Sequence, residues 1–238
     1  MANIRLVDRK GNFLKTTIDR ERLDRPQKEE KNSLEDRIRP HAHAIITSRY
    51  GYILIQKRAK KNRTLAPEAE VPINGGHVLE SDLYDYEQEI KERKEFIEKN
   101  PLINSETRSK IDENEQFIQR VTPYHLAASR ELKEELHMEV NPLLIGEPID
   151  ESYIEIRDAK NNPYQAYVKV FSLLYNQAEH GDLIINKSEV KDVYFVSAKR
   201  IPKEDLVKLT GEEFAERLLK HINEIANSRK LPLMKSIY

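Results

Sequence analysis

The run TPYHLAASRELKEELH, residues 122–137, constrains the fold of this chain more than any other stretch. Thr122 can cap a helix, and Pro123 suits the first helical position because the N–H that it lacks would have no intrahelical partner there. At 3.6 residues per turn, acidic positions at i, i+3 and i+4 share one face, whereas the leucines at 132 and 136 lie on another. The acidic positions are Glu131, Glu134 and Glu135. The run therefore predicts a helix with one acidic and one apolar face.

The acidic face has two readings. Three carboxylates this close repel one another unless a cation joins them, and hard cations such as magnesium prefer oxygen ligands. A solvated helix face is the alternative, and it is the default for an arbitrary glutamate cluster. The residues upstream of the helix are needed to decide between the two.

Charge and hydropathy narrow the class of protein. Lys plus Arg (40) and Asp plus Glu (41) nearly cancel in the 238 residues, leaving a formal charge of −1. No global field therefore attracts nucleic acid, which argues against a nucleic-acid partner. No apolar run approaches the roughly 20 residues that span a bilayer, and the first residues lack a signal-peptide core. We expect a cytoplasmic protein that does not enter a membrane.

The chain contains no cysteine. This excludes disulfides, thiolate zinc sites and cysteine nucleophiles. Charged residues make up 34% of the chain, so long exposed helices are expected to carry the excess. Residues 83–121 match that expectation, because apolar residues recur at helical spacing in a charged background that Asn100-Pro101 interrupts. They predict a helical hairpin.

Alternating apolar residues predict strands on both sides of this hairpin. The predicted strands comprise an N-terminal pair within residues 4–14, a core pair at 39–47 and 52–58, and later runs at 143–145, 153–156, 164–175 and 189–196. His41 and His43 share a strand face, where packing or substrate contact is favoured over an incomplete metal site. Arg58 ends a core strand in a basic cluster, and it is the candidate for a phosphate contact. A C-terminal helix is expected to begin near Thr210.

Two separated segments together resemble the Nudix box, a glycine-led loop that runs into a helix. The first is Gly75-Gly76-His77-Val78, and the second is Arg130-Glu131-Leu132-Lys133-Glu134-Glu135-Leu136-His137-Met138. The family's spacing places an acid six residues after the second glycine, where this chain has Asp82. About forty residues then intervene before the helix, and we interpret them as an insertion. His137 stands where the family has glycine.

The flanking residues look most like the isopentenyl diphosphate isomerase-like branch of the superfamily, which contains isomerases and hydrolases. The residues that resemble this branch are the opening hairpin, Gln56-Lys57-Arg58 and Gly76-His77. Isomerases of this type use a cysteine just before their Gly-His pair. This chain has Gly75 in the corresponding place and no cysteine elsewhere, which argues against isomerase chemistry.

The resemblance implies an α+β fold, with a mixed sheet in an α/β/α sandwich and an inserted helical hairpin. We expect one domain over residues 1–238. Its expected parts are an N-terminal hairpin and connection (1–38), a core (39–82 and 122–200), the helical insertion (83–121) and a C-terminal helical segment (201–238).

The resemblance also implies an activity, the hydrolysis of a diphosphate linkage in a small molecule, usually a nucleoside diphosphate derivative, with Mg²⁺ or Mn²⁺ as the cofactor. The implied metal ligands are Glu131, Glu134 and Glu135. Glu131 is the first choice of catalytic base, and Arg130 would orient the carboxylates. Gly75 and Gly76 would support the metal site, with Arg58 on the substrate. The alternative bases are Glu151, Glu155, Glu179 and Glu189, and Asp82 is a doubtful ligand because the insertion starts beside it.

Two other functions stay open at this point. A catalytically weak or inactive binding protein on the same scaffold is suggested by the split box and by His137. A homodimer built by the charged hairpin is the third reading.

Overall fold

The computed structural model describes residues 3–19, 38–59, 66–102, 104–157 and 163–228. Strands β1 (Asn3–Val7) and β2 (Phe13–Asp19) form a separate antiparallel pair. The main sheet contains β3 (Arg39–Ser48), β4 (Tyr52–Arg58), β5 (Glu70–Val71), β6 (Asn74–His77), β7 (Asp150–Arg157), β8 (Pro163–Tyr175) and β9 (Val190–Ser197). The helices are α2 (Glu80–Lys99), α3 (Ser105–Arg120), α4 (Pro123–Leu136), α5 (Gln177–His180), α6 (Lys203–Thr210) and α7 (Glu212–Ser228).

The main sheet is mixed and is built around β3. This strand pairs in parallel with β8 on one side and antiparallel with β4 and β6 on the other. β4 pairs with the end of β3, where Thr47 lies opposite Ile53. β6 pairs with residues 41–44 at the beginning of β3. The glycine-led loop is thus held within the sheet as a short strand.

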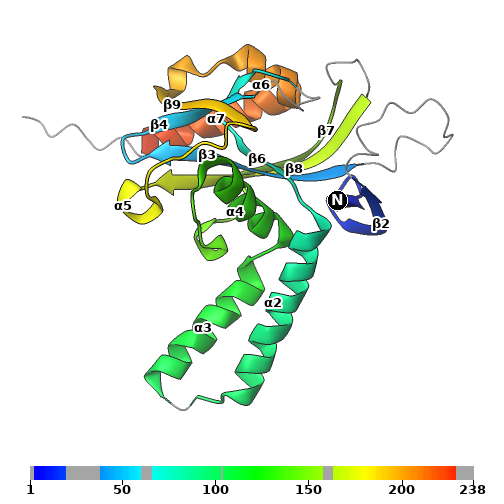
Figure 1. The fold of residues 1–238 in the computed structure, drawn as a ribbon, viewed down its shortest axis with the longest axis vertical. Coiled ribbons are helices and arrows are strands. Elements are labelled where there is room, and N and C mark those ends of the chain that lie inside the picture. The colour runs from blue at the N-terminus through cyan, green and yellow to red at the C-terminus, as the bar shows by residue number, and fades with distance from the viewer. Residues whose placement is uncertain (1–2, 20–37, 60–65, 103, 158–162, 229–238) are drawn as a thin grey trace, which may run out of the picture.

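Alternation along β3 creates two cores. Ala42, Ala44 and Ile46 join a buried cluster with Leu132 and Leu136 of α4, whereas Ile45 joins a second cluster with residues of α6 and α7. Figure 1 shows the result, with α4 below the sheet and α6 and α7 above it. The predicted α+β sandwich with a mixed sheet is confirmed.

Helices α2 and α3 stand away from this sandwich as a hairpin (Figure 1). Arg93 of α2 lies over the ring of Phe117 of α3, 3.9 Å from its centroid, and donates to Asn114 at 2.6 Å. Two helices are therefore present where the sequence predicted a helical hairpin. Whether they are an insertion within a family motif stays a prediction, as does the division of the chain into parts.

One detail of the sequence reading is wrong. The apolar run at 143–145 contains a 3₁₀ turn, Pro142–Leu144, because Asn141 caps it through a bond from the Leu143 N–H at 3.0 Å. The C-terminal helix expected near Thr210 is present as α7, and a further helix, α6, precedes it, with Gly211 between them at a positive φ of 81°. Residues 158–162, between β7 and β8, lie outside the described residues.

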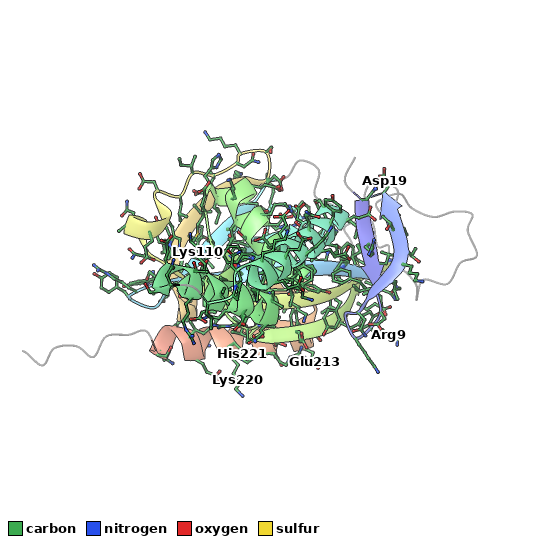
Figure 2. The ribbon with its side chains drawn as sticks, turned by 90° about the horizontal axis from the view of Figure 1, so that it is seen from below. Arg9, Asp19, Lys110, Glu213, Lys220 and His221 are labelled. Carbon is green, nitrogen blue, oxygen red and sulfur yellow. The ribbon has the colours of Figure 1, made fainter. Side chains whose placement is uncertain are left out.

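Charged side chains occupy the outer surfaces of the molecule. Figure 2 shows Lys110 on α3, with Glu213, Lys220 and His221 along α7. The side chain of Glu213 is 91% exposed, and it accepts a bond from Arg217 one turn later. The described residues include no helix that is both long and apolar enough to cross a membrane.

Candidate functional site

The candidate site lies where α4 packs on β6. Helix α4 begins after Thr122, whose backbone N–H donates to Nδ1 of His125 at 3.1 Å. Its apolar face is buried against the sheet, with Leu132 and Leu136 fully enclosed. Glu131 and Glu135 of the neighbouring face are thereby held against the backbone of Gly76 and Gly75. The structure brings together the two segments that carry the family resemblance.

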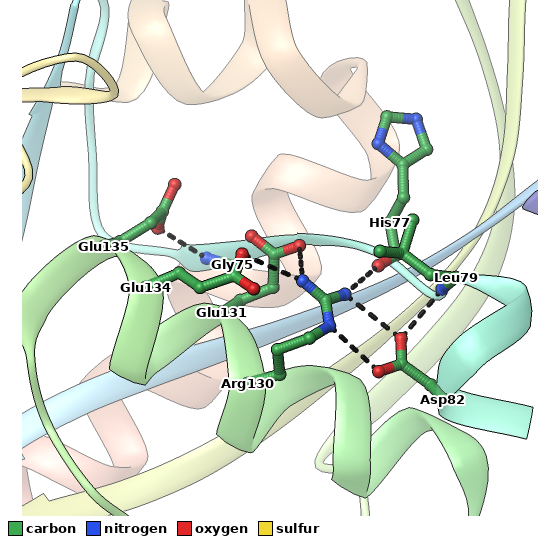
Figure 3. Close-up of polar contacts among 8 residues, drawn as sticks. All are labelled: Gly75, His77, Leu79, Asp82, Arg130, Glu131, Glu134 and Glu135. Carbon is green, nitrogen blue, oxygen red and sulfur yellow. Dashed lines mark hydrogen bonds and ion pairs between the residues drawn. The ribbon is translucent and has the colours of Figure 1, made fainter. Parts of the chain in front are cut away.

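Arg130 is the centre of the polar network at this site (Figure 3). Its guanidinium bonds to both carboxylate oxygens of Asp82, at 2.9 and 3.1 Å. It also donates to Glu131 at 2.9 Å, to Glu134 at 3.1 Å and to the His77 carbonyl at 2.8 Å. A single side chain therefore ties the helix start of α2, the end of β6 and two acids of α4 to one another.

Asp82 acts on the network from the helical hairpin. Its side chain is 4% exposed, and it accepts a 2.8 Å bond from the Leu79 N–H, which caps the start of α2. It was the doubtful ligand of the sequence reading. In the structure it is the bidentate partner of Arg130, an arrangement that restricts the orientation of the guanidinium.

Two glycines allow the carboxylates to lie against the sheet. A Cβ on Gly76 would meet the carboxylate of Glu131 at 2.7 Å, and one on Gly75 would meet the Ala42 carbonyl at 2.2 Å. Gly75 also has a φ of 138°, which side chains other than glycine rarely adopt. Its N–H donates to Glu135 Oε2 at 3.2 Å. Both glycines are therefore needed for this close approach.

Burial raises the pKa of Glu131 to about 7, against the lowering effect of Arg130 and with a further rise from the charges of Glu135 and Glu134. Burial by itself lowers the pKa of Arg130. The bond to Asp82 and the charges of the neighbouring carboxylates outweigh this effect and raise that pKa above its ordinary value. Three carboxylates, those of Asp82, Glu131 and Glu134, thus face one guanidinium, and the charge of Glu135 acts on Glu131. The local charge remains negative when they are ionised.

The chemistry of this donor set fits a hard divalent cation. Glu131, Glu134 and Glu135 each use one oxygen in the bonds described above, and carboxylate oxygens are the ligands that magnesium prefers. Within the described part of the chain, however, no three His, Asp or Glu side chains are grouped closely enough to hold a metal ion. The three glutamates share a region without converging on one point.

The helix ends through its contact with a distant loop. His137 adopts the left-handed conformation, with φ 53° and ψ 26°, and its Nδ1 lies 2.8 Å from the Ile184 carbonyl. The N–H groups of Ile184 and Asn186 donate to the carbonyls of Leu136 and Glu135 at 3.1 and 2.9 Å. His137 thus adopts the conformation expected of a glycine and adds a side-chain contact that glycine lacks.

Arg58 is buried at the end of β4, where its N–H donates to the Ala69 carbonyl at 2.9 Å. Its neighbour Lys57 is engaged by Glu70 at 2.6 Å. Lys60, Lys61 and Arg63 of the basic cluster lie outside the described residues. The contact between Arg58 and a phosphate stays a prediction.

The alternative bases lie elsewhere in the fold. Glu151 of β7 pairs with Lys169 at 2.9 Å, and Glu155 of the same strand accepts from the Tyr153 hydroxyl at 2.9 Å. Glu179 lies in α5, and Glu189 immediately precedes β9. Glu131 is the candidate base that belongs to the Arg130 network.

The other face of β6 carries an imidazole cluster. His41 Nε2 lies 2.7 Å from the hydroxyl of Tyr164, which is 3.4 Å from His77 Nε2. In Figure 3 the His77 ring points away from Arg130, although its carbonyl faces the guanidinium. The guanidinium of Arg39 lies 4.3 Å from the centroid of the Tyr164 ring. His41 and His43 are packed side chains, as favoured from the sequence, and substrate contact stays a prediction.

A surface cavity of about 540 Å³ lies at the opposite end of α4. Its lining includes Thr122, His125, Glu151 and Lys169, and it includes none of the acids that contact Arg130. The cavity is therefore separate from the acidic site.

No protein-family model and no curated protein matches this sequence. Solved structures with a similar fold include DR0079 of Deinococcus radiodurans, with 14% identity over 92% of this chain and 98% of that one, at a TM-score of 0.46. A NUDIX hydrolase of Alicyclobacillus acidocaldarius has 14% identity over 79% and 91%, with a TM-score of 0.43.

A third similar structure is a bifunctional NMN adenylyltransferase/ADP ribose pyrophosphatase of Francisella tularensis, complexed with AMP and a manganese ion. It has 12% identity over 87% of this chain and 45% of that one, at a TM-score of 0.43.

Sequence reasoning missed two features of the site. One is the contact between Asp82 and Arg130, which joins residues 48 positions apart. The other is a pair of buried amides, Gln56 and Asn74, on the face of the sheet that α4 covers. Asn74 directly precedes the double glycine, and a polar residue in that buried strand was the signal available.

Proposed function

We propose that this protein is a Nudix hydrolase that cleaves the diphosphate linkage of a nucleoside diphosphate derivative or a related organic diphosphate, with Mg²⁺ or Mn²⁺ as the cofactor. The observation that carries this proposal is the Arg130 network, which joins Asp82, Glu131 and Glu134 beside Gly75 and Gly76. A diphosphate is an anion, and an uncompensated acidic face would repel it. A divalent cation bound between the carboxylates and the diphosphate would replace this repulsion with attraction to both.

The residues have separate roles in this proposal. Glu131, Glu134 and Glu135 would hold the cation, which when bound supplies positive charge to the diphosphate oxygens and acidifies a water. Arg130 would orient Glu131 and Glu134 through its 2.9 and 3.1 Å bonds. The backbone of Gly75 would fix Glu135, and Arg58 would contact a phosphate of the substrate.

Glu131 would also serve as the general base. A base works best when its pKa lies near the operating pH, and burial raises the pKa of Glu131 to about 7. In the metal-free chain its carboxyl can therefore take up and release a proton near neutral pH. Its packing against Gly76 of β6 shields the carboxyl from bulk water, since the residue is 8% exposed.

The test is turnover of a panel of nucleoside diphosphate derivatives with magnesium, with manganese and with EDTA. Phosphorylated products are expected only with a metal ion, and Glu135→Gln is expected to abolish their release. Glu106→Gln is the matched control, because it neutralises an exposed glutamate that pairs with Lys110 on α3. Absence of turnover by the wild type across the whole panel would falsify the hydrolase proposal.

A binding protein that uses the same site without turnover is the second candidate. The engagement of both Glu131 and Glu134 by Arg130 and the histidine at position 137 favour it. It predicts that diphosphates raise the melting temperature without being cleaved. Product formation with metal decides against it.

A further inference from the structure

Two buried amide side chains on the face of the sheet that α4 covers have atoms without hydrogen-bond partners in the part of the chain that the structure describes. Asn74 of β6 has no exposed surface, and neither its Nδ2 nor its Oδ1 has a partner. Gln56 of β4 is 1% exposed, and its Nε2 has none. Buried amides are nearly always hydrogen-bonded, because leaving them unpaired is costly. This pair therefore indicates a polar partner that the chain itself does not supply.

The strand register places Asn74 beside Glu135. Asn74 pairs with Ala44 and Gly76 with Ala42, and both alanines belong to the core on the α4 side. Gly76 lies against Glu131. Two residues along a strand span about 6.6 Å, and four along a helix about 6 Å. The distance from Gly76 to Asn74 along β6 is therefore close to the distance from Glu131 to Glu135 along α4, so Asn74 lies opposite Glu135 as Gly76 lies opposite Glu131.

One hydrogen bond fixes this alignment, because the N–H of Gly75, the residue after Asn74, donates to Glu135 Oε2 at 3.2 Å. Gln56 belongs to the same face of the sheet. It lies two positions after Leu54 on β4, and the side chain of Leu54 is in the α4-side core. Both amides therefore face the layer that contains the acidic helix.

We propose that Asn74 and Gln56 are positioning residues of the divalent-cation site, and that their amides hydrogen-bond the hydration shell of a cation held at Glu135. This inference rests on the proposed function. An amide both donates and accepts, as does water, and magnesium keeps several waters when proteins bind it. An anion would be repelled by the neighbouring carboxylates, and an apolar ligand would leave the amides unpaired.

The test measures Mg²⁺-dependent stabilisation of the full chain without substrate. The protein is stripped with EDTA, titrated with MgCl₂ and followed by thermal unfolding. Asn74→Leu is expected to keep or raise the metal-free melting temperature, because it replaces an unpaired amide with an apolar group of similar size. It is expected to weaken the apparent Mg²⁺ affinity by about tenfold or more, as is typical when a partner behind the metal ligands is lost.

Gln165→Leu provides the matched control. Gln165 is also buried with one unpartnered amide atom, Oε1, but it lies on β8, where its Nε2 contacts Glu155 at 3.4 Å. The Mg²⁺ response of this variant is expected to equal that of the wild type. A similar loss in both variants would show a general effect of removing buried amides and would overturn the inference.

Asn74→Asp is the second variant, and it keeps the test decisive if Asn74→Leu does not fold. An added carboxylate is expected to lower the metal-free melting temperature and to enlarge the stabilisation by Mg²⁺. An unchanged Mg²⁺ response in the Asn74 variants overturns the inference and leaves the proposed function standing, because a buried water alone would then satisfy the amides. No Mg²⁺ response in the wild type overturns both.

Discussion

At the scale of single residues, the site is organised by one cation among several anions. The side chain of Arg130 is 22% exposed and bonds to three carboxylates and a carbonyl. Such a network restrains its members only while every partner is present, because removal of one leaves another buried group unpaired. The contribution of each residue is therefore best measured by isosteric changes.

Asp82→Asn tests the bidentate pair. Asparagine can still accept the bond from the Leu79 N–H, so the substitution removes the charge and leaves the helix cap. We expect the free energy of unfolding to fall by about 1–3 kcal/mol, since hydrogen bonds to charged groups are worth that much. Urea denaturation measures it. The control Glu106→Gln, at an exposed pair with Lys110, should have no measurable effect, and an equal loss in both variants would contradict the prediction.

Glu131 gives a pH dependence with a definite sign. Its pKa is raised to about 7 in the folded chain from an ordinary 4.5, so the folded state binds the proton more tightly. Stability from this group is fully present below pH 4.5 and is lost as the pH rises through 7. Arg130, Glu134 and Glu135 are the charged groups that face it.

In EDTA, the wild type is therefore expected to lose stability relative to Glu131→Gln between pH 5 and 8, by roughly 1–3 kcal/mol given about 1.4 kcal/mol per pKa unit. Added Mg²⁺ should restore it at pH 8 in the wild type and not in the variant. Urea unfolding at four pH values measures both effects. Parallel pH profiles for the two proteins would refute the assignment of the raised pKa to Glu131.

At the scale of elements, the sequence predicted helix α4 and the core strands well, because each has a clear apolar period. It did not predict the termini and the short pieces. The run at 143–145 is apolar enough for a strand, but Asn141-Pro142 starts a 3₁₀ turn there. The buried position of Asn74 depends on β6 pairing with β3, a contact between residues about 30 positions apart that local pattern does not contain.

The end of α4 also combines a local and a distant effect. The left-handed backbone of His137 costs free energy for any residue with a Cβ, while its ring bonds to the Ile184 carbonyl at 2.8 Å. His137→Ala should lose the bond and keep the strain, whereas His137→Gly should lose both. We therefore expect the glycine variant to be more stable than the alanine variant by about 1 kcal/mol in urea denaturation. Equal stabilities would argue against backbone strain at this position.

At the scale of the whole molecule, the fold is a sandwich with a hairpin attached near its acidic site. Leu83 at the base of α2 belongs to the α4-side core, whereas Ile111 and Phe117 of α3 belong to neither of the two large core clusters. The hairpin contributes Asp82 to the Arg130 network from this same base. The part of the hairpin beyond this base therefore contributes neither to the two large core clusters nor to the Arg130 network.

Replacement of residues 84–120 by a short Gly/Ser linker tests this separation, because it keeps Asp82 and Leu83 and removes most of both helices. We expect the shortened protein to unfold cooperatively and to retain the wild-type stabilisation by Mg²⁺, since the carboxylates and Arg130 remain. Asp82→Asn in the shortened protein is the control, and it should weaken the network as it does in the full chain. The oligomeric state, obtained from the mass in solution, decides the homodimer alternative. A dimer built by the hairpin becomes a monomer on shortening, whereas an unchanged oligomeric state shows that the hairpin does not build a dimer. Loss of the Mg²⁺ response with the core still folded would instead mean that the hairpin takes part in the site beyond Asp82.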